Sequence, residues 1–221
     1  MMATCAVLDE DYLLGEFSLN QDMSHGENLV PMIKEVLDNL KLKPEDIDLY
    51  GVAIGPGSFT GLRIGVATVK SFAHVFNKPI IGVSSLEGLA FNLAYNGIIV
   101  PMIDARRNRV YTGIYKWEEN NLLNIMETCT LEIDDLLEKL MEYEDIIVNG
   151  NGVNLHRYRI SDKLGDNVNF APIALNECRA SSIGELAIKK YNKGIRDNYY
   201  TLAPEYLKES QAQRDLKKKE G

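Results

Sequence analysis

The sequence has few residues of the kinds that hold metal ions. Only three cysteines and three histidines occur among 221 residues. Cys5, Cys129 and Cys178 lie far apart, form no C-x-x-C pair and have no cluster of histidines beside them. We therefore expect three buried thiols and no metal site.

Long apolar runs and an excess of basic residues are also missing. Nowhere do about 18 apolar residues run together, and no basic segment leads into an apolar one at the N-terminus. The sequence thus predicts neither a membrane span nor a secretory signal, and it indicates a cytoplasmic protein. Its 32 acidic and 24 basic residues give a net charge of -8, which opposes attraction to a polyphosphate backbone. We expect no membrane partner and no binding of nucleic acid by this chain unaided.

The most informative stretch that is present is glycine-rich, Gly55-Pro56-Gly57-Ser58-Phe59-Thr60-Gly61-Leu62-Arg63-Ile64-Gly65. A short β-prone run precedes it over 49–54, and apolar residues at helical spacing follow it to Phe76. The predicted order is strand, tight loop, helix. Ser58 and Thr60 can cap that helix, and the glycines permit a positive φ or a close backbone approach.

The same loop is a candidate anion site, because free N–H groups at a helix N-terminus attract phosphate. It matches neither common phosphate motif, since Thr60 stands where both G-x-x-x-x-G-K-[ST] and G-x-G-x-x-G require glycine. We favour a structural turn and keep the anion site open. The residues of this phosphate or structural loop are Gly55, Gly57, Ser58, Thr60, Gly61 and Arg63.

The helix after the loop, expected over 62–76, carries only Arg63, Lys70 and His74 as charged or titratable residues. A helix this apolar all round is predicted to be buried on more than one side. Either it lies inside its own domain or a second protein covers what its lobe leaves open.

The chain divides into two halves with the same order of predicted elements, which is a weak internal repeat. Residues 1–97 form the first lobe, 98–194 the second lobe, and 195–221 a C-terminal segment with a polar tail. Each half reads as strands, helix, strand with a glycine loop, helix, short strand, helix. In the second half the glycine loop is Gly150-Asn151-Gly152, and Ser182-x-x-Glu185 is predicted to cap the final helix.

The two halves differ at their starts, because the second has three leading strands and the first has two. Unless the repeat is imperfect, the first strand of the first half is missing. Met1-Met2 would then be a start inside the protein, roughly one strand of five to ten residues late.

With these motifs in place, the sequence resembles the bacterial TsaB family, the dimerisation subunit of the machinery that makes threonylcarbamoyladenosine in tRNA. The resemblance runs nearly end to end, and the glycine-rich motif is its most specific part. The fold it implies is α/β, two ribonuclease-H-like lobes of the actin-like ATPase and sugar-kinase superfamily. Family members normally open with a strand ending in Asp-Thr, which is absent here. Two further motifs support the resemblance, Ile103-Asp104-Ala105-Arg106-Arg107-Asn108-Arg109-Val110-Tyr111 and Tyr206-Leu207-Lys208-Glu209-Ser210-Gln211-Ala212.

The resemblance also bears on catalysis. TsaD, the catalytic relative, holds a metal with two histidines, and Ser85 and Leu89 stand at the corresponding positions here. Serine is a poor metal ligand and leucine is none. The resemblance therefore implies no TsaD-like metal site, no threonylcarbamoyl transfer by this chain alone and no cofactor of its own, with ATP and metal expected on partner subunits.

The function implied is that of a non-catalytic subunit that pairs with TsaD, works with the ATPase TsaE and supports modification of the adenosine next to the anticodon. tRNA would be reached only through the complex. Homodimerisation through the same surface is a related prediction. The candidate interface residues, on the helices of the first lobe, are His25, Leu29, Met32, Val36, Val69, Phe72 and Phe76.

A peptidase-like or nucleotide-dependent enzyme is the alternative. A phosphotransferase needs a carboxylate-held magnesium and a phosphate loop, for which Asp104 and the loop over 55–61 are the candidates. Asp104 at a strand end is more typical of a turn, and Arg106 in the same motif is more typical of a solvated hairpin than of an RNA contact. No histidine lies in a recognisable peptidase setting.

Overall fold

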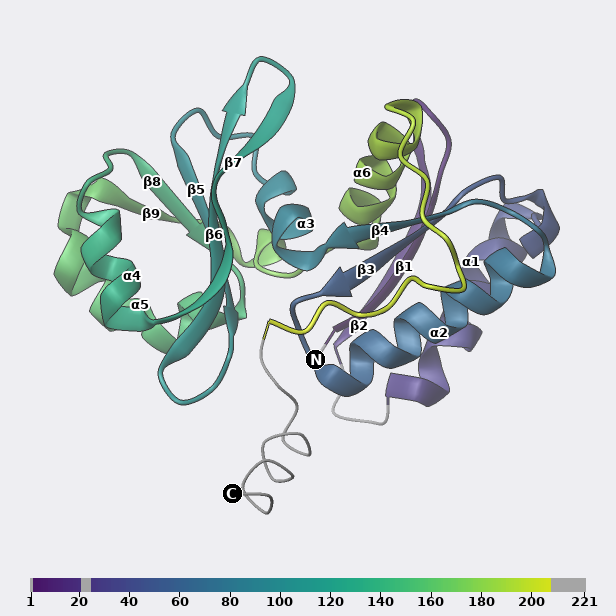
Figure 1. Ribbon diagram of the computed structural model, residues 1–221, viewed down its shortest axis with the longest axis horizontal. Coiled ribbons are helices and arrows are strands. Elements are labelled where there is room, and N and C mark those ends of the chain that lie inside the picture. The colour runs from purple at the N-terminus through teal and green to yellow at the C-terminus, as the bar shows by residue number, and fades with distance from the viewer. Residues whose placement is uncertain (1, 21–24, 208–221) are drawn as a thin grey trace.

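The computed structural model describes residues 2–20 and 25–207, with side chains described from residue 28 in the second range. Two α/β lobes lie side by side and are joined by short connections (Figure 1). Among the described residues, no helix is long and apolar enough to cross a membrane.

The first lobe contains two separate two-stranded sheets. Its elements are β1 (Met2–Leu8), β2 (Leu13–Asn20), α1 (His25–Leu40), the 3-10 turn η1 (Pro44–Asp46), β3 (Tyr50–Gly55), α2 (Phe59–Val75), β4 (Ile80–Ser84) and α3 (Ser85–Phe91). β1 pairs antiparallel with β2, and β3 pairs parallel with β4. Helix α1 packs on β1 and β2, while α2 packs on β3 and β4, so both helices cover the same side of the lobe.

The second lobe is built on one five-stranded sheet. The second half of the chain contains β5 (Ile98–Asp104), β6 (Arg109–Glu118), β7 (Asn121–Glu132), α4 (Ile133–Leu140), β8 (Ile146–Asn149), α5 (Asn151–Leu164), η2 (Gly165–Asn167), β9 (Val168–Phe170) and η3 (Ile173–Leu175), and it ends with α6 (Ala180–Asn192). The strand order is β7-β6-β5-β8-β9, with β6 antiparallel to both neighbours and β8 parallel to β5 and β9. This is the ribonuclease-H-like arrangement that the resemblance implies.

The last helix of each half packs against the other half. Leu86 and Leu89 of α3 enter a core with Ile99 of β5 and Ile147 of β8. Conversely, Ile183 of α6 packs with β4, and α6 also contacts β1 and β3. Residue 98 lies between the sheets of the two lobes, and α6, which falls within the range 98–194 predicted as the second lobe, buries its apolar face on the first lobe.

The C-terminal segment from residue 195 to residue 207 also lies on the first lobe, where it follows β4 and α2 (Figure 1). The Asp197 carboxylate accepts a hydrogen bond from the Gly82 N–H at 2.7 Å. The Lys70 ammonium donates to the Leu202 carbonyl at 2.8 Å, and the Glu205 N–H donates to the Ile54 carbonyl at 2.7 Å. The segment therefore ends beside the glycine loop.

All three cysteines are free, and each is partly buried rather than fully buried as expected. Burial raises the pKa of the Cys5 thiol to about 11 and that of Cys178 to about 12. Neither thiol is ionised near neutral pH, so both behave as small apolar groups rather than as nucleophiles.

Candidate functional site at the junction of the lobes

The glycine loop turns sharply because the C-terminal segment crosses it. Gly55 ends β3 with φ 123°, a conformation that favours glycine. A β-carbon at this position would lie 2.7 Å from the carbonyl oxygen of Glu205. Gly55 is thus required by backbone conformation and by a close backbone neighbour together, which supports the structural-turn interpretation of the loop.

The Ser58 side chain starts the helix that follows. Its Oγ accepts a hydrogen bond from the Gly61 N–H at 3.3 Å, and α2 begins at Phe59. The predicted cap by Ser58 is confirmed, whereas Thr60 lies within the first turn and is exposed. Because the hydroxyl already satisfies one terminal N–H, Ser58 acts here as a cap.

Arg63 joins the glycine loop to the C-terminal segment. Its guanidinium carbon lies 3.8 Å from the centre of the Phe59 ring, and its Nε donates to the Tyr206 hydroxyl at 3.0 Å. The Phe59 and Tyr206 rings are themselves 4.9 Å apart. Two of the three sequence motifs therefore meet in the fold, although the part of the third motif from residue 208 onward lies outside the described residues.

The hairpin between β5 and β6 carries the remaining motif. Asp104 accepts a hydrogen bond from the Arg106 N–H at 2.7 Å, and its own N–H donates to the Asn151 side chain at 3.0 Å. Arg106, Arg107 and Asn108 have φ values of 62°, 57° and 58°. The Asp104 carboxylate thus stabilises a turn of left-handed residues, and the exposed Arg106 side chain extends from that turn.

A cavity of about 1570 Å³ connects these groups. Ser58 and Arg63 line it from the first lobe, Asp104 and Arg106 from the second. The sequence-predicted residues therefore share one cavity, but the side chains of Ser58, Arg63 and Asp104 each have a structural partner. Glu177, which the sequence did not indicate, lines the same cavity, and burial raises the pKa of its carboxyl.

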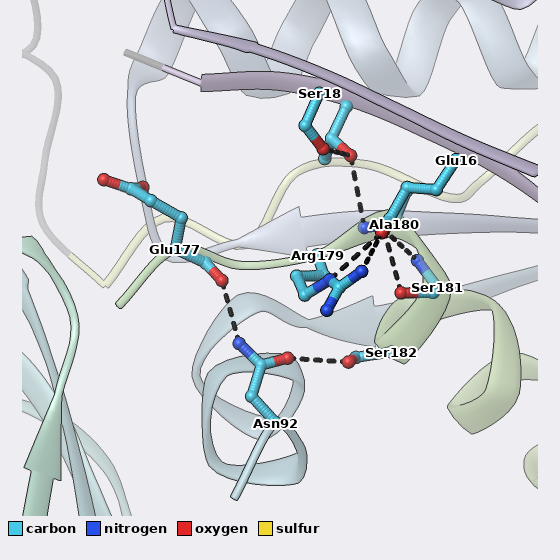
Figure 2. A network of polar contacts seen from close by, with 9 residues as sticks. Glu16, Ser18, Asn92, Glu177, Arg179, Ala180, Ser181 and Ser182 are labelled. Carbon is cyan, nitrogen blue, oxygen red and sulfur yellow. Dashed lines mark hydrogen bonds and ion pairs between the residues drawn. The ribbon is translucent and has the colours of Figure 1, made fainter. Parts of the chain in front are cut away.

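A polar network that the sequence gives no sign of fixes α6 to the first lobe (Figure 2). The Glu16 carboxylate of β2 accepts hydrogen bonds from the Arg179 guanidinium and from the Ser181 N–H and Oγ, the last two at 2.9 and 2.8 Å. Burial alone raises the pKa of Glu16, but the bonds from Arg179 and Ser181 outweigh it, so the pKa lies below its ordinary value.

This network corrects the predicted cap of α6. The helix begins at Ala180, two residues before Ser182, and Ser182 Oγ bonds the Asn92 side chain at 2.6 Å instead of capping. The carboxylate of Glu16 takes the capping role from 165 positions away in the sequence. The residues next to the start of a helix cannot indicate a capping side chain that comes from a distant β-strand.

Comparison with known proteins places the chain in a family. Residues 13–216 match the family model described as TsaD, tRNA N6-adenosine threonylcarbamoyltransferase. The tRNA threonylcarbamoyladenosine biosynthesis protein TsaB of Bacillus subtilis is 33% identical over 210 residues, which cover 94% of this chain and 90% of that protein. The chain belongs to the TsaB family. The Escherichia coli protein of the same name is 31% identical over 53% of this chain and 52% of its own length.

Solved structures show the same fold as this TsaB-family chain. YeaZ from Pseudomonas aeruginosa superposes with a TM-score of 0.77 and 22% identity, over 93% of this chain and 94% of that one. A second Pseudomonas aeruginosa structure, described as an uncharacterised protein with similarity to peptidase YEAZ, has a TM-score of 0.79, also at 22% identity, and the match covers 94% of both chains. These matches show that the chain has the same two-lobed α/β fold, and the strand order of the second lobe agrees with the predicted ribonuclease-H-like lobe. The actin-like ATPase and sugar-kinase superfamily stays a prediction.

The candidate interface residues of this family member occupy different environments. Met32 and Val36 of α1 are buried, and Val36 packs toward Gly15 of β2. His25 begins α1, but its side chain is outside the described part of the structure. The others are partly buried, and Phe72 stacks between the rings of Tyr50 and Phe76; these partly buried residues are Leu29, Val69, Phe72 and Phe76.

Ser85 and Leu89, the positions that the resemblance relates to metal-binding histidines of TsaD, are both buried. Ser85 is 6% exposed and Leu89 is 2% exposed. Within the residues that the structure describes, no group of three histidine, cysteine or acidic side chains is placed to hold a metal ion. Leu89 packs in the same core as Ile99 of β5, and neither a serine hydroxyl nor a leucine side chain suits a metal site.

Proposed function

We propose that this protein is a non-catalytic subunit of the bacterial machinery that makes threonylcarbamoyladenosine in tRNA. The observation that carries the proposal is membership of the TsaB family over nearly the whole chain. Relatives in Bacillus subtilis, Escherichia coli and Haemophilus influenzae are all named tRNA threonylcarbamoyladenosine biosynthesis proteins. In this role the chain pairs in the cytoplasm with a TsaD-like catalytic subunit, works with a TsaE-like ATPase and meets tRNA only through the complex.

The structural roles of the candidate catalytic side chains support the proposal that this subunit catalyses no reaction by itself. The Ser58 hydroxyl caps α2, and the Asp104 carboxylate holds a hairpin turn. Ser85 and Leu89 pack in the core of the lobes. ATP and metal are accordingly proposed to belong to the partner subunits, and this chain needs no cofactor of its own.

Helices α1 and α2 supply the proposed partner surface. They contact each other, and the inward sides of α1 and α2 are occupied by the lobe's own strands. The outward side of α2 exposes Ala67, Ser71 and Val75, which recur every four residues, and Val75 is 72% exposed. Val30 of α1 is 49% exposed. The same surface is proposed to form a homodimer when the catalytic partner is absent.

Replacing Val75 with glutamate is expected to weaken capture of the TsaD-like subunit at least about 10-fold, because it places a charge within an apolar contact. The measurement is a pull-down of the TsaD-like subunit from the same organism by the tagged full chain, followed by quantification of threonylcarbamoyladenosine in tRNA from cells that depend on the variant. We expect both signals to fall together.

Leu155→Glu is the matched control, since Leu155 is 64% exposed on α5 of the second lobe and the substitution adds the same charge. It should leave capture and tRNA modification unchanged. The proposed partner surface is wrong if Val75→Glu and Leu155→Glu change capture of the TsaD-like subunit to the same extent. The proposed function itself is wrong if cells lacking the whole protein keep their normal level of threonylcarbamoyladenosine.

A further inference from the structure

The sequence contains three Asn-Gly dipeptides, at 96–97, 149–150 and 151–152. Asparagine is one of the chemically labile residues of proteins. A glycine that follows it increases this lability, because glycine has no side chain to shield its backbone nitrogen and adjusts its backbone conformation readily. The structure places the three dipeptides in different environments, so it distinguishes positions that are alike in sequence.

The two Asn-Gly dipeptides of the second lobe are held by hydrogen bonds. The Asn149 side chain is fully buried, and its Nδ2 donates to the carbonyls of Leu89 and Leu175 at 2.8 and 3.0 Å. Asn151 is the first residue of α5, and its side-chain oxygen accepts from the Asp104 N–H at 3.0 Å. Neither side chain reaches the backbone nitrogen that follows it unless these contacts first open.

Asn96 lies in the segment 92–97, which connects α3 to β5 (Figure 1). Its side chain is exposed. Within the part of the chain that the structure describes, we find no hydrogen bond to the Asn96 side chain or from the Gly97 N–H. The side-chain carbonyl of Asn96 is therefore free to approach the Gly97 nitrogen in the folded protein.

The fold also requires the glycine of this dipeptide. A β-carbon at position 97 would lie 2.0 Å from the Asp145 carbonyl oxygen and 2.7 Å from Asp145 Oδ2. The next residue, Ile98, donates its N–H to the same carbonyl at 2.9 Å. A side chain at position 97 would push β5 away from the segment that leads into β8, so packing keeps a glycine beside Asn96.

We propose that Asn96 is a site of spontaneous deamidation and that its isoaspartate product loosens the connection between α3 and β5. The Gly97 nitrogen attacks the Asn96 Cγ. One C–N bond forms, the bond from Cγ to Nδ2 breaks, and ammonia leaves with the proton of the Gly97 N–H. Water then opens the five-membered succinimide at either carbonyl, which gives aspartate or isoaspartate. The reaction consumes one water and needs no oxidant or reductant.

The connection is anchored on both sides of the reacting bond. The Leu93 carbonyl accepts from the Trp117 indole N–H at 2.7 Å, and the Tyr95 hydroxyl donates to the Asp145 carboxylate. Isoaspartate routes the main chain through its β-carbon, so the chain between these anchors and β5 becomes one atom longer. The product also adds a negative charge next to Gly97, which the Asp145 carboxylate already adjoins, and like charges repel.

The first test incubates the full chain in warm, mildly alkaline buffer and follows tryptic peptides 71–106 and 140–157 by tandem mass spectrometry. We expect Asn96 to deamidate at least about 10-fold faster than Asn149 or Asn151, because those two require local opening first. In denaturing urea the three should react at similar rates. Equal rates in the folded protein would overturn the proposal, and so would an Asn96 that reacts in urea but stays intact in the folded chain.

The second test measures hydrogen exchange of the Ile98 amide, which bonds the Asp145 carbonyl. It compares incubated wild type, in which a protein isoaspartate methyltransferase labels the product, with two variants. Asn96→Gln does not form the five-membered ring readily, and Asn96→Asp adds the charge without the extra main-chain atom. Exchange in the isoaspartate form should be about 10-fold faster than in Asn96→Gln, with Asn96→Asp between them.

An isoaspartate form that exchanges Ile98 at the rate of Asn96→Gln would show that the connection is not loosened, and that part of the proposal would be wrong. Both tests use the isolated full chain. Neither depends on tRNA modification or on a partner subunit, so failure here is distinct from failure of the proposed function.

Discussion

Replacing Gly150 with alanine is expected to lower the free energy of unfolding by about 3 to 4 kcal/mol. Gly150 lies between β8 and α5 of the second lobe, with φ 101° and ψ 164°. Only glycine occupies this backbone region readily. A β-carbon there would lie 2.2 Å from the carbonyl oxygen of Met102 in the central strand β5. Neither group can move aside, because both belong to buried backbone.

The loss of stability can be measured by urea denaturation, followed by the fluorescence of Trp117, the only tryptophan in the sequence. Trp117 lies on β6 in the same lobe, and its indole N–H donates to the Leu93 carbonyl at 2.7 Å. Gly65→Ala is the matched control, because no atom lies within 4 Å of a β-carbon built at Gly65 in α2. That control should be neutral or stabilising by about 0.5 to 1 kcal/mol. Equal denaturation midpoints for Gly150→Ala and wild type would contradict the argument.

Replacing Glu16 with alanine is expected to cost about 3 kcal/mol of stability. The Glu16 side chain is only 10% exposed and accepts hydrogen bonds from Arg179 and Ser181 at the start of α6. Its removal leaves a guanidinium and a helix-terminal N–H without their acceptor. Because α6 is the element that the second half contributes to the first lobe, its N-terminus should also detach more readily, which hydrogen exchange at residues 181–184 measures.

The control for Glu16 is Glu185→Ala on the outer side of the same helix. Glu185 pairs with Lys189 at 3.3 Å, but both side chains are about half exposed, at 50% and 43%. An exposed pair of this kind contributes at most about 0.5 kcal/mol. Similar losses for the two variants would show that the network in Figure 2 adds nothing beyond an ordinary surface ion pair.

The contribution of Glu16 should also depend on pH. Its pKa in the folded protein lies below its ordinary value of 4.5, so the folded state holds the carboxylate more strongly than the unfolded state does. The stabilisation is therefore fully present above this ordinary value and is lost as the pH falls through the folded-state pKa. In urea titrations at pH 7 and at about pH 3, the difference between wild type and Glu16→Gln should shrink at the lower pH. A difference that is constant with pH would exclude this carboxylate as the cause.

Several features of this fold follow from local sequence. The stretch from Leu49 to Phe76 predicts strand, glycine loop and helix, and the structure has β3, the loop and α2 there, although α2 begins three residues before the expected start at Leu62. Ser58 is found capping that helix. Strands, caps and turns of this kind depend on side chains and backbone only a few residues apart, so their pattern is visible in one sequence.

The pairing of distant elements was not predictable in the same way. Nothing near Ser182 indicates that α6 is capped by Glu16, and nothing in α3 or α6 indicates that each packs on the other half. The helical spacing of Met32 and Val36 is equally typical of a partner interface and of a protein core. In the structure both residues are buried. An apolar helix face indicates that something covers it, but its sequence does not indicate which element or protein that is.

The sequence by itself determined the order of elements, the glycine junctions of both lobes, the difference of one leading strand and the resemblance to the TsaB family. Only the tertiary structure decided that Arg63 contacts Tyr206, that α3 packs on β5 and α6 on β1 and β3, and that one cavity is lined by both β1 and β3. The reason is physical. Backbone conformation is set by neighbours along the chain, whereas burial and hydrogen bonding across the lobes are set by surfaces that meet only after folding.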